Sequence, residues 1–274
     1  MIYLERIPAA PLSQFVRVIW YASTDQVAHG QERVLPNGCV QVILSLARDF
    51  LLDCPESEPV RMTSPALIVG ARSVYEIIDR SDFACIIGII FEPGGFSRFA
   101  ADAVDQFSNR NVALEDIWGP GAQRLRDRLR EIAAPVDCMR CIEEFLRNRL
   151  LSLAMPRSAT RHAAVDFALG AFRRAPALST VREVARSTGW SERRFSQVFR
   201  EEVGLSPKVW CRIQRFQRVV RQLHTGAELA WSELALDCGF YDQSHFANEF
   251  KAFSGIDATT YAARRTQWAN HISV

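Results

Sequence analysis

The stretches VARSTGW (Val184–Trp190) and LALDCGF (Leu234–Phe240) decide the fold of the C-terminal part of this chain, because they are two copies of one pattern. The copies are 50 residues apart up to the Gly-aromatic pair and 51 residues apart after it, so one residue has been added at the second turn. In each copy an Ala four residues before the Gly lets two helices approach closely, and the Gly tolerates the positive φ that ends the first helix. The repeat therefore predicts two helix-turn-helix units.

An apolar face with helical spacing follows each turn and ends at a glycine. The matching residues are Phe195, Phe199 and Gly204 in the first copy, and Phe246, Phe250 and Gly255 in the second. Both copies are also rich in Arg and polar side chains. Two such units in tandem suggest a protein that lays two helices into DNA.

Capping signals divide the C-terminal third into seven expected helices. Thr180 with Glu183 forms a capping-box pattern, and Ser206 places a cap before a proline at the first helical position. The fourth helix is the longest, and we expect it to act as a rod between the two units. The expected helices are Ala159–Phe172, Val181–Thr188, Ser191 to about Val203, Pro207 to about Leu223, Ser232–Cys238, Asp242–Phe253 and Thr259–Arg265.

The N-terminal part has the pattern of short strands followed by helices. Residues 114–155 show helical periodicity, with Pro135 between two helices and a linker expected at Met155–Ser158. We therefore expect an α+β chain: an N-terminal β-barrel-like or sandwich domain with a helical hairpin, 1–157, and an all-α domain of seven helices, 158–274. The expected strands are Phe15–Tyr21, Cys39–Leu44, Ala66–Gly70 and Phe83–Phe91, separated by Gly and Pro turns.

Two apolar stripes in the expected hairpin have two alternative uses. They either pair with a second copy of the chain or dock on the chain's own β-domain, and their shortness favours the second use. A homodimer is still expected, because two copies would double the contact with DNA. The stripes are Leu125, Leu129 and Ile132 on the first helix, and Met139, Ile142 and Leu146 on the second.

Composition narrows the class of protein. The chain has 274 residues, of which 48% are hydrophobic, and this suits two ordinary domains. Residues 158–274 carry 16 Lys and Arg against 11 Asp and Glu, whereas residues 1–157 carry 17 against 20, so the basic half is the half with the repeat. Seven scattered Cys, no apolar run near the roughly 20 residues of a membrane span, and a start unlike a signal peptide favour the cytoplasm.

The C-terminal pattern resembles the AraC/XylS family of bacterial transcription activators over about residues 158–265. The family often has Ser-Pro where this chain has Asp257-Ala258, a difference that affects only a helix start. The N-terminal half is similar to sensor domains of some members. The resemblance is carried by the Ala-x-x-x-Gly turn, the Phe-x-x-x-Phe-Arg helix, Gly204–Trp210, Cys238–Phe246 with Phe250-Lys251, and, in the N-terminal half, Leu35–Gly38, Phe91–Phe96 and Leu114–Gly119.

The resemblance implies a transcription regulator whose C-terminal domain binds double-stranded DNA. Its N-terminal domain would sense a small-molecule effector or mediate homodimerisation, and RNA polymerase would be a further partner of an activator. No cofactor and no metal is implied, and an enzyme is not expected. Two rival readings stay open: a small-molecule-binding sensor or interaction protein with weak DNA binding and, less favoured, an enzyme that uses a pocket of the β-domain.

The polar faces of the two recognition helices supply the candidates for DNA contact. The family usually has Arg where this chain has Asn248, which is shorter and uncharged. Because Arg pairs two hydrogen bonds with guanine and Gln does so with adenine, we expect the first helix to discriminate bases better than the second. By resemblance, the candidates are Glu192, Arg193, Ser196, Gln197 and Arg200 in the first helix, and Asp242, Gln243, Ser244, Asn248 and Lys251 in the second.

Aromatic side chains near the expected strands suggest where an effector would bind. Weak candidates are Trp20, Tyr21, Tyr75 and Phe91, and filling of the core is the alternative for each of them. Cys138 and Cys141 have the Cys-x-x-Cys spacing of a metal or redox site. They lie on an expected helix and no second Cys pair accompanies them, which favours ordinary half-buried cysteines.

Overall fold

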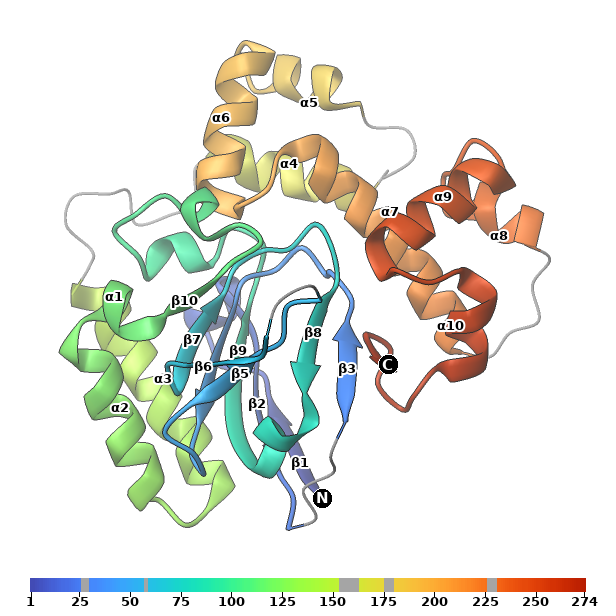
Figure 1. Ribbon diagram of the computed structural model, residues 1–274. Helices are drawn as coiled ribbons and strands as arrows, with labels where there is room; N and C mark the ends of the chain where they lie inside the picture. The colour runs from blue at the N-terminus through green and yellow to red at the C-terminus, as the bar shows by residue number, and fades with distance from the viewer. Residues whose placement is uncertain (26–29, 57–58, 153–162, 175–179, 226–230) are drawn as a thin grey trace.

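The computed structural model describes residues 1–25, 30–56, 59–152, 163–174, 180–225 and 231–274 (Figure 1). Strands and three helices form the N-terminal part, and seven helices and a last short strand form the described C-terminal part. This order confirms the α+β prediction. The expected linker Met155–Ser158 lies outside the described residues, and the domain boundary at 157/158 stays a prediction.

The N-terminal part is built on a six-stranded antiparallel sheet in the order β1-β2-β9-β4-β7-β10. The four strands that the sequence predicts are the four central ones, where β-branched and aromatic side chains are packed from both sides. The edge strands β1 and β10 were not predicted. The bounds are β1 Ile2–Arg6, β2 Val16–Ser23, β4 Gln41–Ser45, β7 Ala66–Val69, β9 Cys85–Phe91 and β10 Asn111–Ala113.

Two smaller sheets complete this part. One has the order β11-β3-β8, with β3 at Gln31–Val34, β8 at Glu76–Asp79 and β11 at His271–Ser273. Since β11 comes from the opposite end of the chain, the last residues complete a sheet of the N-terminal part (Figure 1). The other small sheet consists of β5, Leu51–Asp53, paired with β6, Arg61–Thr63. The N-terminal part also contains the 3-10 helices η1 Leu12–Gln14, η2 Arg80–Ala84, η3 Phe96–Arg98 and η4 Val104–Phe107.

The predicted helical hairpin is present beside the main sheet (Figure 1). It consists of α2 (Pro120–Glu131) and α3 (Pro135–Ser152), after the short α1 (Leu114–Trp118). Pro135 opens α3 as predicted. The two apolar stripes are used within the chain, because Leu125, Leu129, Met139, Ile142 and Leu146 are buried in its own core and Ile132 packs against it.

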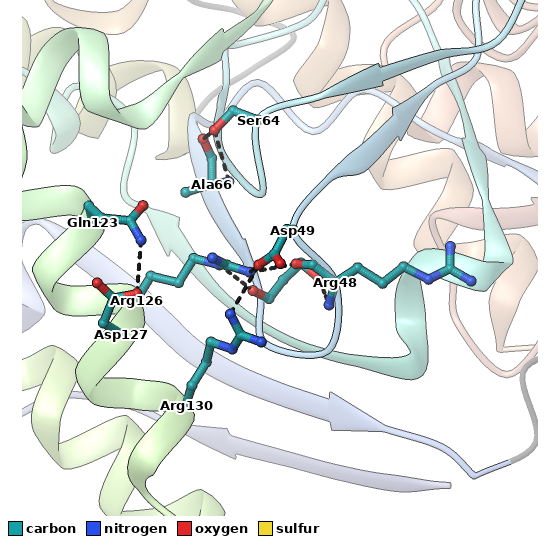
Figure 2. A network of polar contacts seen from close by, with 9 residues as sticks. Arg48, Asp49, Ser64, Ala66, Gln123, Arg126, Asp127 and Arg130 are labelled. Carbon is teal, nitrogen blue, oxygen red and sulfur yellow. Dashed lines mark hydrogen bonds and ion pairs between the residues drawn. The ribbon is translucent and has the colours of Figure 1, made fainter.

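A network centred on Arg126 fastens α2 to the turn after β4 (Figure 2). Its side chain is only 3% exposed and donates to the carbonyl oxygens of Ser45 at 2.8 Å and Arg48 at 2.6 Å. It also donates to Asp49 Oδ1 at 2.8 Å, and Arg130 reaches the same oxygen at 3.0 Å. The hydrogen bond from Arg126 lowers the pKa of the Asp49 carboxyl. A buried guanidinium is tolerated only when its donors are paired, so this network holds the helical layer in place.

The C-terminal part contains the seven predicted helices. Most of their ends differ from the prediction by one or two residues, as is usual for helix termini. The first is described only from Ala163, because residues 159–162 lie outside the description. The bounds are α4 Ala163–Arg174, α5 Val181–Ser187, α6 Glu192–Val203, α7 Pro207–His224, α8 Trp231–Asp237, α9 Gln243–Ser254 and α10 Ala258–Arg264.

The last residues of the chain tie the helical part to the strands. Strand β11 pairs with β3 in antiparallel register, and His271 Nδ1 lies 2.9 Å from Glu32 Oε2. The ring of Trp268 packs on that of Tyr3 with centroids 4.3 Å apart. The last residues of the chain therefore pack against the N-terminal part, although they come after the predicted domain boundary at 157/158. Local sequence pattern does not reveal such a contact, because the residues that meet are far apart in the sequence.

Glu92 makes a second connection between the two parts. Its carboxylate accepts from Arg17 of the N-terminal part at 3.1 Å and from Arg173 of α4 at 2.6 Å. Burial opposes ionisation of Glu92, but the two ion pairs outweigh it and lower the pKa of its carboxyl. Gln217 of α7 adds a hydrogen bond of 2.8 Å to the carbonyl oxygen of Pro36. The helical part is thus docked on the strands through several polar contacts.

Candidate nucleic-acid interface

The first unit consists of α5 and α6 around a tight turn. The predicted capping box is formed, since Thr180 Oγ1 accepts from the Glu183 backbone N–H and the Glu183 carboxylate accepts from the Thr180 backbone N–H. Gly189 has a φ of +77°, which confirms the expected left-handed turn. Ser191 then caps α6 by accepting from the backbone N–H of Arg194.

Two phenylalanines orient α6. Phe195 and Phe199 are fully buried, and the ring of Phe199 lies 6.2 Å from Phe172 of α4 and 6.2 Å from Trp210 of α7. Because Phe195 and Phe199 are four residues apart, they lie on one face of the helix. The polar residues of α6 are therefore turned away from the core.

The predicted DNA-contacting residues of α6 lie on this outer face. Glu192, Arg193, Gln197 and Arg200 are exposed, and Ser196 is half-buried. Gln197 donates to Glu201 at 2.9 Å along the helix, and the Glu192 carboxylate lies 3.9 Å from Arg182. Both are exposed contacts of small energy that a DNA ligand can replace.

Arg200 differs from the other candidates of this helix. Its Nε donates to Asp105 Oδ2 of η4 at 3.0 Å, so the C-terminal end of α6 is paired with the N-terminal part. Contact of Arg200 with a phosphate would have to replace this ion pair. The structure thus joins Arg200 to the surface between the two parts and leaves Arg193 at the other end of the helix, with Gln197 midway along it.

The second unit repeats the plan with α8 and α9. Gly239 has a φ of +84°, and Asp242 caps α9 by accepting from the His245 backbone N–H at 2.7 Å. Phe250 is fully buried, with its ring 5.2 Å from Phe216 of α7 and 5.7 Å from Tyr261 of α10. Its five predicted contact residues, Asp242, Gln243, Ser244, Asn248 and Lys251, are all exposed.

An ion pair connects α9 to the long helix α7. Arg212 Nε donates to both carboxylate oxygens of Glu249, at 3.0 and 2.9 Å. Glu249 is buried, and the pair raises the pKa of the Arg212 guanidinium. In the first unit the repeat places Val198 at the corresponding position, where it packs in the core. The two recognition helices are therefore attached to α7 by different chemistry.

Tyr241 is a surface feature that the sequence prediction missed. It is the residue added at the second turn, it directly precedes the cap Asp242, and 87% of it is exposed. Its backbone N–H donates to His245 Nδ1 at 3.3 Å, which fixes the start of α9. An exposed aromatic ring at the N-terminus of a recognition helix can contact a sugar, a thymine methyl group or a phosphate. The change of offset from 50 to 51 was the signal that marked this position.

The four aromatic effector candidates do not lie together. Trp20 belongs to a small cluster with Ala22 and Ile86, and its indole covers Gly88 of β9. The Tyr21 hydroxyl lies 3.1 Å from Cys85 Sγ. Phe91 packs in the main core, 5.1 Å from Phe96 between ring centroids, whereas Tyr75 faces the C-terminal part.

A small cavity lies between β3, β4 and β7. Its volume is about 20 Å³, room for a single water molecule, and it is lined by residues that include Leu35, Cys39 and Arg72. Cys138 and Cys141 are buried, and burial raises the pKa of both thiols, which keeps them protonated and inert. Within the described ranges, no cluster of three or more His, Cys, Asp or Glu side chains is placed to hold a metal ion.

No helix among the described residues is long and apolar enough to cross a membrane.

Two family models match the chain. One, described as a helix-turn-helix domain, matches residues 184–264, from within α5 to the end of α10. It covers both repeat units just described. The C-terminal part of the chain carries an AraC-type helix-turn-helix domain. The second model, described as a domain of unknown function, matches residues 4–113, from β1 to β10. A search of curated protein sequences gives no match.

Several solved structures resemble this chain. The C-terminal domain of AraT, a response regulator from Geobacillus stearothermophilus, has 22% identity and a TM-score of 0.36, over 39% of this chain and 88% of that one. ToxT from Vibrio cholerae O395 bound to (E)-4-(8-methylnaphthalen-1-yl)but-3-enoic acid has 10% identity and a TM-score of 0.48, over 96% and 99%. Wild-type ToxT from Vibrio cholerae strain SCE256, bound to an unsaturated fatty acid, has 12% identity and a TM-score of 0.46, over 89% and 94%.

Proposed function

We propose that this regulator inserts α6 and α9 into successive major grooves on one face of DNA, about 34 Å apart. The observation that carries the proposal is the repeat itself: each unit buries its two phenylalanines and exposes the polar face of its second helix. Because α7 carries apolar contacts with both units, it serves as the rod between them.

The two recognition helices would have different roles: α6 would read base edges, and α9 would mainly contact the phosphate backbone. Arg193 and Gln197 have side chains suited to bidentate hydrogen bonds with guanine and adenine, so they would read base edges. In α9, Lys251 and Gln243 would hold the phosphate backbone, and Asn248 would add a weak preference for adenine. The N-terminus of each helix carries a partial positive charge that favours nearby phosphates.

Binding by the full-length protein tests this proposal. Sites are first selected from a random pool of duplexes, and affinity for the selected site is then measured at several salt concentrations. We expect affinity to fall steeply with salt, because Arg and Lys contacts release counterions. Arg193→Ala should weaken binding, whereas Arg140→Ala on the exposed side of α3 is the matched control and should not. Affinity that does not change with salt would contradict the proposal.

We also infer that a small-molecule effector acts through the contacts between the two parts. Tyr75, one of the four aromatic candidates, lies against the C-terminal end of α9. A thermal-shift screen of small organic compounds on the full-length protein checks this idea. A compound that raises the melting temperature should also change DNA affinity, and stabilising compounds without effect on DNA would contradict it.

The homodimer stays a prediction. Both stripes expected to support it are used inside the chain, so a dimer would need another surface. Sedimentation at micromolar concentration, with and without the selected DNA, tests it. A single species of 31.0 kDa without DNA, together with one protein chain per duplex when DNA is present, would exclude a dimer.

A further inference from the structure

One short loop of the N-terminal part touches both helix-turn-helix units. This bracket loop, Ala71–Tyr75, joins β7 to β8. A methyl group placed on Gly204 would lie 3.2 Å from Cβ of Ala71, and one placed on Gly255 would lie 2.5 Å from Cε1 of Tyr75. The backbones of these two glycines therefore approach opposite ends of the same loop.

The two glycines are equivalent positions of the repeat. Gly204 ends α6 and Gly255 ends α9, with φ of +90° and +73°, and both backbone N–H groups close the last turn of their helix. Such a left-handed C-cap brings the backbone to the surface without a side chain. The bracket loop thus contacts the recognition helices at corresponding ends, away from their DNA-reading N-termini.

The first of these contacts is reinforced by polar groups. The Ser108 hydroxyl donates to the carbonyl oxygen of Gly204, and Val104 packs on Gly204 beside Ala71. One turn earlier in α6, Arg200 pairs with Asp105 at 3.0 Å. The C-terminal end of α6 is therefore held by apolar, hydrogen-bonded and ionic contacts together.

The bracket loop is itself firmly held. Arg72 donates to Glu76 at 2.6 Å and to Asn111 Oδ1 at 2.8 Å, and the Ser73 backbone N–H donates to Asn109 Oδ1 at 2.7 Å. At the other end, the Tyr75 hydroxyl donates to Glu56, and the Arg33 guanidinium lies over the Tyr75 ring at 5.0 Å. A loop held in this way can fix the positions of the two helix ends that it contacts relative to each other.

The reach of the loop limits how far apart the two helix ends can lie. Ala71 and Tyr75 are four residues apart, which corresponds to at most about 14 Å of extended chain. Within the C-terminal part the units are joined by α7, whose 18 residues span about 27 Å. Long helices bend, so α7 alone leaves the relative placement of α6 and α9 adjustable. A second connection through the bracket loop removes this freedom.

We propose that Ala71 and Tyr75 are positioning residues that set the separation of α6 and α9, and hence the spacing of DNA half-sites that the protein accepts. The proposal rests on the proposed insertion of both helices into DNA. It gives the N-terminal part a direct role in recognition without contact to DNA. Tyr75 carries the larger share, since its side chain supplies the three atoms that lie nearest to a methyl group placed on Gly255 of the second unit.

The test measures half-site spacing with the full-length protein. The selected site is lengthened or shortened by one base pair between its halves, and a third duplex keeps only the half read by α6. One base pair turns a half-site by about 35°, so the wild-type protein should lose at least about tenfold in affinity. Tyr75→Ala should reduce this loss to about threefold or less, while its affinity for the single half-site stays within about twofold of wild type.

Control variants separate positioning from folding. Tyr75→Phe keeps the ring on Gly255 and loses only the bond to Glu56, so it should keep the wild-type spacing profile. Tyr75→Leu replaces Tyr75→Ala if the latter is unfolded by circular dichroism, and should relax the spacing in the same way. An unchanged spacing profile in a folded Tyr75→Ala or Tyr75→Leu variant, or an equal loss on all duplexes, would overturn the inference. A wild-type protein without spacing dependence would instead contradict the insertion of both helices.

Discussion

The two helix-turn-helix units have the same backbone plan and different surfaces. Both close their turn on a glycine with positive φ and bury two phenylalanines, one of which packs on an aromatic ring of α7. The first exposes Arg193 and Gln197 where the repeat gives the second Ser244 and Asn248. The buried residues of both units must fill the same kind of core, whereas the exposed residues of each unit are constrained only by the ligand that they contact. We infer that the first unit supplies most base reading and the second mostly positions the protein.

The difference extends to how each recognition helix is held. At its C-terminal end α6 is paired with the N-terminal part through Arg200, whereas α9 is paired with α7 through Glu249. The first attachment joins two parts of the protein, and the second lies within one part. Conditions that change the contact between the parts should therefore affect α6 more than α9 through this ion pair.

The largest expected effect concerns base reading by the first unit. Arg193→Ala and Gln197→Ala should each lose about 1–3 kcal/mol of discrimination at the base pairs that they read. Affinities for single-base variants of the selected site measure this loss. Arg194→Ala is the matched control, since Arg194 lies 5.6 Å from the Trp190 ring within the first unit and should lower affinity evenly if at all. An even loss in Arg193→Ala would assign that residue to a phosphate.

The next effect concerns the attachment of α9. Glu249→Gln removes the charge that pairs with the half-buried Arg212 and should lower the free energy of unfolding by about 1–2 kcal/mol. Urea unfolding of the full-length protein measures it. Glu192→Gln is the control in the first unit, where the exposed pair at 3.9 Å should contribute no more than about 0.5 kcal/mol. An equal loss of unfolding free energy in the two variants would contradict the stronger ionic attachment that we assign to α9.

A smaller effect is expected at the contact of α6 with η4. Asp105→Asn releases Arg200, which can then reach a phosphate, so DNA affinity should rise a few-fold. The slope of the logarithm of the binding constant against the logarithm of the salt concentration should steepen by about 1, the change expected for one added phosphate contact. Asp102→Asn makes the same charge change at an exposed neighbouring position and should leave both values unchanged. A fall in affinity in Asp105→Asn would show that the ion pair aids binding.

The smallest of these effects concerns the added residue of the second unit. Tyr241→Ala should lower affinity by about two- to fivefold, because its exposed ring lies at the start of α9, where backbone contacts set position. The loss should be similar for all single-base variants of the site. Tyr241→Phe keeps the ring and distinguishes a stacking contact from a hydrogen bond to phosphate. A loss confined to one base pair would make Tyr241 a base-reading residue.

Local signals explain how much of the fold could be predicted from the sequence. Thr180, Ser206 and the repeat glycines act on their own turn of the chain, so the seven helices and both turns followed from them. Runs of β-branched residues likewise marked the four central strands. Of the edge strands, β10 has only three residues, and β1 ends in the charged residues Glu5 and Arg6, so neither gave such a signal.

Contacts between residues that are far apart in the chain leave no local pattern in the sequence, so they could not be predicted from it. The pairing of β11 with β3 and the approach of Tyr75 to Gly255 join residues about 180 or more positions apart. Tyr75 was predicted as an effector candidate because it is aromatic, and aromaticity alone does not tell which surface a ring covers. The exposed polar faces of α6 and α9 could be predicted, but the ion pair that engages Arg200 could not.

The inequality of the two recognition helices is tested most directly by one set of binding curves. Wild type, Arg193→Ala and Asn248→Ala are measured on the selected site and on every single-base variant of it, at one salt concentration. Arg193→Ala should lose discrimination at defined base pairs, and Asn248→Ala should stay within about 0.5 kcal/mol of wild type throughout. A larger loss of discrimination in Asn248→Ala than in Arg193→Ala would contradict the assignment of base reading to the first unit.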